Sequence, residues 1–374
     1  MKVALRSVAV LLLGVLFGSA AMALPRFASR TGAKCQSCHV NPSGGGMRQA
    51  FGVQYGRETL PVPTWSKDFE LEDFTSVLTN FIGIGADFRT LFYYIQMPDT
   101  GSPPKAQDAQ NAFWQMQGNI DFNFKLAKRV NIYLSKGLYS GFEIFGQLNV
   151  LPSNGFIKIG KFIPNYGIKI DDHRTFIRQY TGFSPELGRP ELTGGEVAIS
   201  PGPATITGGF YNASDAFGAA TSSKKAFLGR AEGIFKLAPD VNLGVGGNVF
   251  SKKNDADVRT TLLGGFGSFS YQQLTVFGEA DIIQTKAPGL TTVSGIVTYI
   301  EADYVVTPGL DLKLAYDFYD PDKDLKTGSF SRYSFGVEFF PLSGVEVRPV
   351  YRILKEDPTD VKNNEFDLMM HFYM

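Results

Sequence analysis

The chain lacks a long apolar run beyond its first residues, and this absence limits how it could enter a membrane. Residues 8–17 are apolar and follow Lys2 and Arg6, and residues 21–23 read Ala-Met-Ala. This is the pattern of a secretory signal with a small-residue cleavage site, and the run is too short for a membrane span. We therefore expect a signal peptide at residues 1–23. Because no later stretch could form a transmembrane helix, a place in a membrane would require a closed β-barrel.

The sequence also lacks an excess of charge of either sign. Lysine plus arginine and aspartate plus glutamate number 36 each, so nothing favours nucleic acid as a partner. Histidine is scarce, with three in the whole chain, whereas glycine (41), phenylalanine (32) and tyrosine (16) are plentiful. This composition favours many strands with glycine-containing turns over a helical fold.

Cysteine is almost absent, and the two cysteines stand together as Cys35 and Cys38, with His39 directly after them. Cys-x-x-Cys-His is the attachment signature of c-type haem, in which each thiol bonds one vinyl group and the histidine ligates the iron. A zinc site would need a second ligand pair, and a thioredoxin-like pair would need a βαβ pattern. The sequence contains neither. We predict one covalent haem c, with His39 as the proximal ligand.

The sixth ligand of that haem is left open by the sequence. The candidates are Met47, His173, Met369 and His371. Met47 is the nearest to the motif in sequence, and it follows three glycines at residues 44–46. A methionine ligand would raise the reduction potential and a second histidine would lower it, and an open position is the alternative.

The expected domain order is a signal peptide (1–23), a haem-binding segment (24–64), a linker (65–80) and a barrel (81–374). The haem-binding segment is too short to bury much core by itself. We therefore expect a small plug docked against something larger, on the periplasmic side or inside the barrel lumen.

Runs of alternating polarity recur from residue 81 to the end, for example at 115–126 and 310–319. They are longer than most strands of soluble sandwiches and suit a transmembrane β-barrel. The fold class predicted is all-β, a transmembrane antiparallel barrel of about sixteen strands with a small N-terminal haem-binding plug. The expected strands are 81–97, 111–127, 130–138, 141–150, 155–163, 193–200, 203–212, 226–237, 240–251, 258–270, 273–285, 292–305, 309–320, 329–341, 343–354 and 364–374.

The connections and the last strand favour the bacterial outer membrane. Even-numbered strands should end in tight turns and odd-numbered strands in longer polar loops, as expected when the N-terminus is periplasmic. Residues 139–140 are the exception, and residues 68–80 could add a strand. Residues 366–374 alternate up to the final residue, as in outer-membrane barrels, although that residue is Met374 instead of an aromatic.

Four carboxylates on two neighbouring expected strands should face the lumen. They could hold a hard cation such as Fe²⁺, or they could form structural ion pairs with basic residues of later strands. The carboxylates are Glu279, Asp281, Glu301 and Asp303. The basic residues are Lys313, Arg332, Arg348 and Arg352.

The longest connection, residues 164–192, should be extracellular and could fold into the lumen. It carries Asp171, Asp172 and His173, which are metal-ligand types, although a solvated turn is the alternative explanation. His371 should face the lumen near the periplasmic rim, where it could approach the haem plug.

A resemblance to a known family rests on residues 25–28 (PRFA), residues 35–39 (CQSCH) and four later positions, all within residues 25–56. The chain resembles the fused outer-membrane monohaem cytochrome c–porins, whose best-known members are iron oxidases of Fe(II)-oxidising bacteria. The resemblance implies haem attachment by Cys35 and Cys38, iron ligation by His39, and electron flow from extracellular Fe(II) to a periplasmic electron-carrier cytochrome. The later matching positions are Pro42, Gly46, Phe51 and Gly52.

The expected function is therefore an electron conduit across the outer membrane, with iron oxidase activity as one form of it. Membrane lipid, a periplasmic cytochrome and extracellular Fe(II), or another redox donor or acceptor, would be its partners. Two alternatives stay open: a solute porin that the haem-bearing segment plugs or gates, and a haem-based sensor of redox state or gas.

Overall fold

The computed structural model describes residues 26–68, 75–96, 111–138, 141–184, 190–213, 223–361 and 363–374. The expected signal peptide and residues 69–74 of the expected linker lie outside these ranges, as do residues 139–140. Within the ranges, no helix has the length and apolarity needed to cross a membrane.

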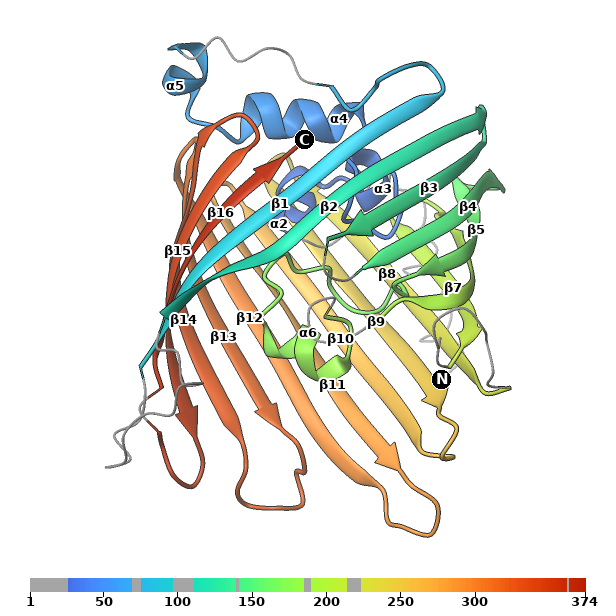
Figure 1. Cartoon of the computed structure of the whole chain (residues 1–374), viewed down its shortest axis with the longest axis vertical. Coiled ribbons are helices and arrows are strands. Elements are labelled where there is room, and N and C mark those ends of the chain that lie inside the picture. Colours follow the sequence, from blue (N-terminus) through green and yellow to red (C-terminus); the bar gives the residue numbers. More distant parts are fainter. Residues whose placement is uncertain are drawn as a thin grey trace, which may run out of the picture.

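Sixteen antiparallel strands close into a barrel in chain order, with β1 paired to β16 (Figure 1). The sixteen predicted strands are confirmed, and every boundary lies within two residues of the expected one. The strands are β1 (Ile82–Ile95), β2 (Asn111–Ala127), β3 (Val130–Gly137), β4 (Phe142–Leu151), β5 (Gly155–Phe162), β6 (Leu192–Ile199), β7 (Ala204–Asn212), β8 (Lys225–Ala238), β9 (Val241–Lys253), β10 (Arg259–Tyr271), β11 (Leu274–Lys286), β12 (Val293–Thr307), β13 (Leu310–Asp320), β14 (Phe330–Leu342), β15 (Val345–Glu356) and β16 (Glu365–Tyr373).

The barrel is apolar outside and polar inside, the reverse of a soluble protein. On β16, Asp367 and His371 are buried in the lumen, whereas Met370 and Phe372 are 43% and 47% exposed on the outer face. Strand side chains alternate between the two faces, so one polar/apolar pattern supplies both a lipid-facing surface and a lined lumen. This is the construction of a barrel in a bacterial outer membrane.

The two ends of the barrel differ in their connections. Even-numbered strands are followed by tight turns such as 128–129, 239–240 and 308–309. Odd-numbered strands are mostly followed by longer loops, of which the connection between β5 and β6 is the longest. The tight turns mark the periplasmic end, which is uppermost in Figure 1, as the sequence predicts.

The N-terminal segment occupies the lumen at the periplasmic end, and we call residues 26–62 the plug (Figure 1). Ser29 and Ser268 of β10 place their hydroxyls 3.0 Å apart, and Arg30 pairs with Asp311 at 2.6 Å. The plug ends at the rim, where the Val62 amide donates to the Phe340 carbonyl at 2.9 Å. Its helices are α2 (Arg26–Thr31), α3 (Cys35–Cys38), α4 (Ala50–Gln54) and the π-helix η2 (Tyr55–Thr59), and α5 (Pro63–Asp68) follows beside β14.

The described residues of the expected linker, 65–68 and 75–80, form no separate strand, and residues 65–68 belong to α5. Val77 makes an isolated bridge with Gly83, and the Ser76 carbonyl accepts the Ile84 amide at 2.9 Å. These contacts attach the segment to the start of β1.

The connection after β5 turns inward and fills the middle of the lumen, where α6 (Phe176–Thr181) lies (Figure 1). We call its described residues, 163–184, the inserted loop. Ile168, Phe176 and Ile177 are buried in a cluster with wall residues of β11 and β12. The prediction that this loop folds into the lumen is confirmed.

Candidate functional site

The Cys-x-x-Cys-His sequence forms α3, a single helical turn inside the plug. The His39 amide donates to the Cys35 carbonyl at 2.8 Å, which fixes the histidine directly after that turn. Cys35 and Cys38 are both free and partly exposed. Two thiols and an imidazole are thus gathered at one end of a short helix.

The imidazole of His39 is held in one orientation by a backbone carbonyl. Its Nδ1 lies 3.3 Å from the Gly46 carbonyl oxygen, so Nδ1 carries the proton and Nε2 keeps its lone pair. Within the part of the chain that the structure describes, Nε2 has no hydrogen-bond or ion-pair partner. Burial, and secondly the charge of Arg48, lowers the pKa of His39 to about 4, which keeps the ring neutral. A neutral histidine oriented through its other nitrogen is the usual arrangement of a metal ligand.

Cys35, Cys38 and His39 line a cavity of about 280 Å³ between the plug, the inserted loop and the barrel wall. This volume is close to the lower end of the range of roughly 300–1,000 Å³ for sites that bury small molecules. Glycines give the cavity its walls: a Cβ on Gly44 would lie 2.9 Å from the Cys35 sulfur, and a Cβ on Gly52 would lie 2.3 Å from the Cys38 carbonyl oxygen. The two thiols and the imidazole are the donor set of a c-type haem, and the cavity lies directly beside them.

The structure contradicts both methionine candidates for the sixth ligand. Met47 is buried against the barrel wall, where its terminal methyl fills the space left by Gly83 of β1. The sulfur of Met369 accepts a hydrogen bond from Arg348 at 3.2 Å. Neither methionine lines the cavity. Both side chains pack at the barrel wall instead.

The two remaining histidines do line the cavity, but in different states. His371 lies 2.8 Å from Glu346 through Nδ1 and 3.2 Å from Asp87 through Nε2. Glu346 orients the ring through Nδ1, and the role of His371 as a distal ligand stays a prediction. His173 lies on the inserted loop with Nε2 3.5 Å from an Arg89 nitrogen, and its role as a ligand stays a prediction.

The four acidic residues predicted as a lumen cation site are not brought together as one. Glu279 accepts the Ile168 amide at 2.7 Å, and Asp281 accepts the Tyr166 hydroxyl at 2.6 Å, so both hold the inserted loop. The other two serve different partners. Glu301 pairs with Lys313 at 2.8 Å, and Asp303 lies 4.0 Å from Arg26 of the plug.

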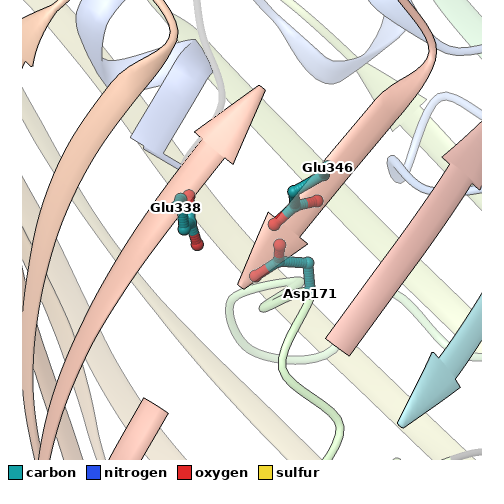
Figure 2. A group of neighbouring side chains, drawn as sticks. All are labelled: Asp171, Glu338 and Glu346. Carbon is teal, nitrogen blue, oxygen red and sulfur yellow. The ribbon is translucent and has the colours of Figure 1, made fainter. Parts of the chain in front are cut away.

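A different acidic group, which the sequence did not reveal, lies between plug, loop and wall: Asp171, Glu338 and Glu346 (Figure 2). Arg348 lies 3.0 Å from Asp171 and 3.1 Å from Glu338, and Arg26 also contacts Glu338. Because cations already sit among these carboxylates, the group is an ion-pair junction and not a metal site. Glu338 and Glu346 belong to the neighbouring strands β14 and β15, but Asp171 comes from the distant inserted loop, so no local sequence pattern predicts the group.

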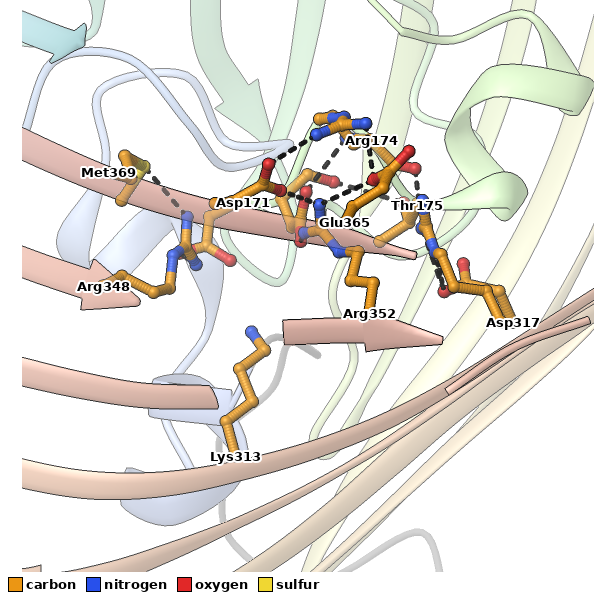
Figure 3. Close-up of polar contacts among 12 residues, drawn as sticks. Asp171, Arg174, Thr175, Lys313, Asp317, Arg348, Arg352, Glu365 and Met369 are labelled. Carbon is orange, nitrogen blue, oxygen red and sulfur yellow. Dashed lines mark hydrogen bonds and ion pairs between the residues drawn. The ribbon is translucent and has the colours of Figure 1, made fainter. Parts of the chain in front are cut away.

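The neighbouring residues of the inserted loop are fixed to the wall in the same way (Figure 3). Asp172 pairs with Arg352 at 2.6 Å, and Arg174 pairs with Glu365 at 2.6 Å and with Asp367 at 2.7 Å. We call these contacts the loop clamp. The alternative of a solvated turn is therefore wrong, and the structure gives Asp171 and Asp172 basic partners in place of a metal.

No family model matches the sequence, and no curated protein matches it significantly. Solved structures of outer-membrane porins and channels are similar in fold. OmpT of Vibrio cholerae superposes with a TM-score of 0.58 at 12% identity, over 80% of this chain and 100% of that one. The outer-membrane channel DcaP of Acinetobacter baumannii gives 0.56 at 12% identity, over 78% and 97%. The anion-selective porin of Comamonas acidovorans gives 0.55 at 11% identity, over 78% and 99%.

The chain has the porin fold of a bacterial outer membrane. At these identities the likeness concerns the barrel alone. Inside this porin-type barrel, the plug and the inserted loop occupy successive levels of the lumen (Figure 1), and the cavity with His39 lies where they meet.

Proposed function

We propose that this porin-type barrel carries one haem c on Cys35 and Cys38 and conducts electrons across the outer membrane. The single observation that carries the proposal is the orientation of His39, whose Nδ1 is bound to the Gly46 carbonyl while its side chain lines the cavity. The resemblance of residues 25–56 to the fused cytochrome c–porins points to the same function. Iron oxidation at the outer surface is the form of it that the resemblance favours.

Each residue of the site would have a separate role in holding the haem. Cys35 and Cys38 would hold the group covalently, and His39 would ligate its iron. When bound, a c-type haem supplies one-electron transfer through the Fe(III)/Fe(II) couple, at a potential set by ligands, burial and hydrogen bonds. The plug and the inserted loop exclude solutes from the lumen, so that charge crosses without the donor entering.

The placement of the plug suits a partner on the periplasmic side. Phe51 of α4, within the plug, and Trp65 of α5, directly after it, are each 48% exposed at the periplasmic end. A periplasmic electron carrier would meet the plug here, and an extracellular donor such as Fe(II) would approach from the opposite end.

The visible absorption spectrum of the purified full-length protein tests the proposal. We expect reduced c-haem bands after anoxic addition of Fe(II), and their loss in the C35A/C38A double variant. Bands that develop with dithionite but not with Fe(II) would retain the conduit and exclude iron as donor. A colourless wild-type protein from cells that mature c-type cytochromes would contradict the proposal.

A solute channel is the second candidate, because the solved structures of similar fold are porins and channels. In this case the plug would gate the lumen. Single-channel recording in planar bilayers separates the two functions. The conduit predicts a closed barrel, whereas the channel predicts stepwise conductance that responds to changes in the plug.

A further inference from the structure

The barrel wall at the end of β14 contacts the N-terminal segment on both of its faces. Phe340 points into the lumen, where its ring centre lies 6.5 Å from that of Phe27 in the plug. Phe339 points outward, and its ring centre lies 5.4 Å from that of Trp65 in α5, edge to face. Neighbouring residues of a strand project to opposite faces. The chain therefore crosses the barrel rim between Phe27 and Trp65.

The register of the barrel fixes Phe339 on the lipid-facing side. Its partners across the sheet are Leu310 of β13 and Val347 of β15. Along β14, Phe335 is 49% exposed on the same outer face, whereas Glu338 is buried in the lumen. Phe339 thus belongs to the apolar surface that the barrel turns towards hydrocarbon, at its periplasmic end.

The residues before α5 fix the place where the chain leaves the lumen. The Arg57 carbonyl accepts the Ser343 hydroxyl at 2.8 Å, and the Val62 amide donates to the Phe340 carbonyl at 2.9 Å. Gly309, in the turn before β13, leaves room for Val62, because a Cβ there would lie 2.5 Å from a Val62 methyl carbon. Figure 1 shows α5 at this rim, apart from α2 and α3 inside the barrel. The segment after the plug therefore reaches the outer edge of the wall.

The indole of Trp65 is left partly uncovered by this arrangement. Trp65 is 48% exposed although it packs on Phe339. Tryptophan is enriched where a membrane meets water, because its ring is apolar while its N–H can stay hydrated. An exposed indole that continues the lipid-facing surface of β14 therefore suits the head-group region of the periplasmic leaflet.

We propose that phospholipid of the periplasmic leaflet binds the exposed face of Trp65 and holds α5 against the outer face of β14. The plug is then secured at its exit by the membrane around the barrel, in addition to its contacts with the wall inside. This contact needs no haem, so it is independent of the proposed function.

Quenching of tryptophan fluorescence tests the contact, because the chain has two tryptophans and Trp114→Phe leaves Trp65 alone. The full-length variant is produced in cells that do not mature c-type cytochromes, so that no haem quenches the emission, and is reconstituted in phosphatidylcholine vesicles. We expect loss of emission when the lipid carries bromine near the glycerol backbone, and little loss with aqueous iodide.

The matched control is Phe51→Trp in a chain whose own tryptophans are both replaced by phenylalanine. Phe51 has the same 48% exposure as Trp65 but lies on α4 of the plug. Iodide should quench this control, and brominated lipid should not. Quenching of Trp65 by iodide alone would overturn the inference. Protection of Trp65 from both quenchers would overturn it too, because protein would then cover the ring.

A second pair of variants tests the role of the wall. Phe339→Ala should lower the quenching of Trp65 by brominated lipid, whereas Phe335→Ala, four residues earlier on the same face of β14, should not. Equal quenching in the two variants would show that Phe339 does not place the indole, and would overturn the contact as proposed. None of these outcomes decides whether the chain carries haem.

Discussion

At the scale of single residues, the site depends on a loop that brings a backbone carbonyl back to the histidine of the Cys-x-x-Cys-His turn. Gly44, Gly45 and Gly46 have φ angles of +87°, +77° and +63°, a left-handed conformation that other residues adopt with strain. This run places the Gly46 carbonyl at His39 Nδ1. The glycines after the motif are therefore part of the site.

Gly52 gives a first prediction, because a Cβ there would lie 2.3 Å from the backbone oxygen of Cys38. Gly52→Ala should separate α4 from α3 and lower the haem bound per protein several-fold. The control is Gly265→Ala on β10, where a Cβ would meet nothing within 4 Å. Equal haem contents in the two variants, measured as pyridine haemochromes, would show that α3 does not depend on this contact.

Met47 gives a second prediction, which tests its exclusion as a ligand. Met47→Leu conserves volume in a buried position and should cost less than about 1.5 kcal/mol of stability. The visible spectrum of the holoprotein should stay unchanged in both oxidation states, whereas His39→Gln should alter it strongly. A changed spectrum in Met47→Leu would mean that the Met47 sulfur is a ligand of the haem iron after all.

The sequence indicated that Cys35, Cys38 and His39 lie together because they fall within five residues, and the structure gathers them at one helical turn. The sequence could not predict what happens to His371, since Asp87 and Glu346 lie on β1 and β15, the two neighbours of β16. Which side chains meet across strands depends on register, and register is not visible in any one segment. The carboxylate contacts of His371 follow from this register and could not be inferred from the sequence.

At the scale of elements, the strands were predictable because alternation and turn residues repeat sixteen times and support one another. The helices of the plug were not, since each is too short to show an apolar period. They are fixed by the wall instead: the Asn242 side chain of β9 donates to the Ser29 carbonyl at 2.9 Å. The sequence indicated that the long loop could enter the lumen. It did not indicate which contacts hold the loop there.

The loop clamp gives a third prediction. Arg352 contacts Asp172 and Asp367 and is 3% exposed, so Arg352→Gln leaves Asp172 without this cation while Asp367 keeps Arg174. Breaking such a pair typically costs about 3–5 kcal/mol, part of which the neighbouring Arg174 should offset. We expect earlier loss of the folded band in heated gel samples, and noisier bilayer currents as the inserted loop loosens.

Lys355 on the same strand is the matched control for that prediction. Its side chain and that of its partner Asp360 are 53% and 45% exposed, and exposed pairs contribute about 0–1 kcal/mol. Lys355→Gln should therefore leave both the gel transition and the currents unchanged. If the two variants behave alike, the clamp does not hold the loop.

At the scale of the whole molecule, two segments close the lumen one after the other, the plug and the inserted loop. The plug bonds mainly to β9, β10, β13 and β14 near the periplasmic rim, while the inserted loop is clamped to the wall beneath it. An ion pair joins them, since Arg26 of the plug lies 3.6 Å from Asp171 of the loop, and both segments contribute side chains to one hydrophobic cluster. Each closure therefore keeps most of its own contacts when the other is disturbed.

The last prediction follows from that independence and concerns deletion of residues 24–64 with the signal peptide retained. The barrel should still assemble, because β1 to β16 close on one another without the plug. Conductance in planar bilayers should rise only modestly, since the clamped loop still obstructs the lumen. Replacing residues 167–182 with a short glycine–serine link in the same deletion should then open a conductance of porin size. Full conductance after the plug deletion alone would mean that the loop does not seal the lumen, and failure to assemble would make the plug part of the folding unit.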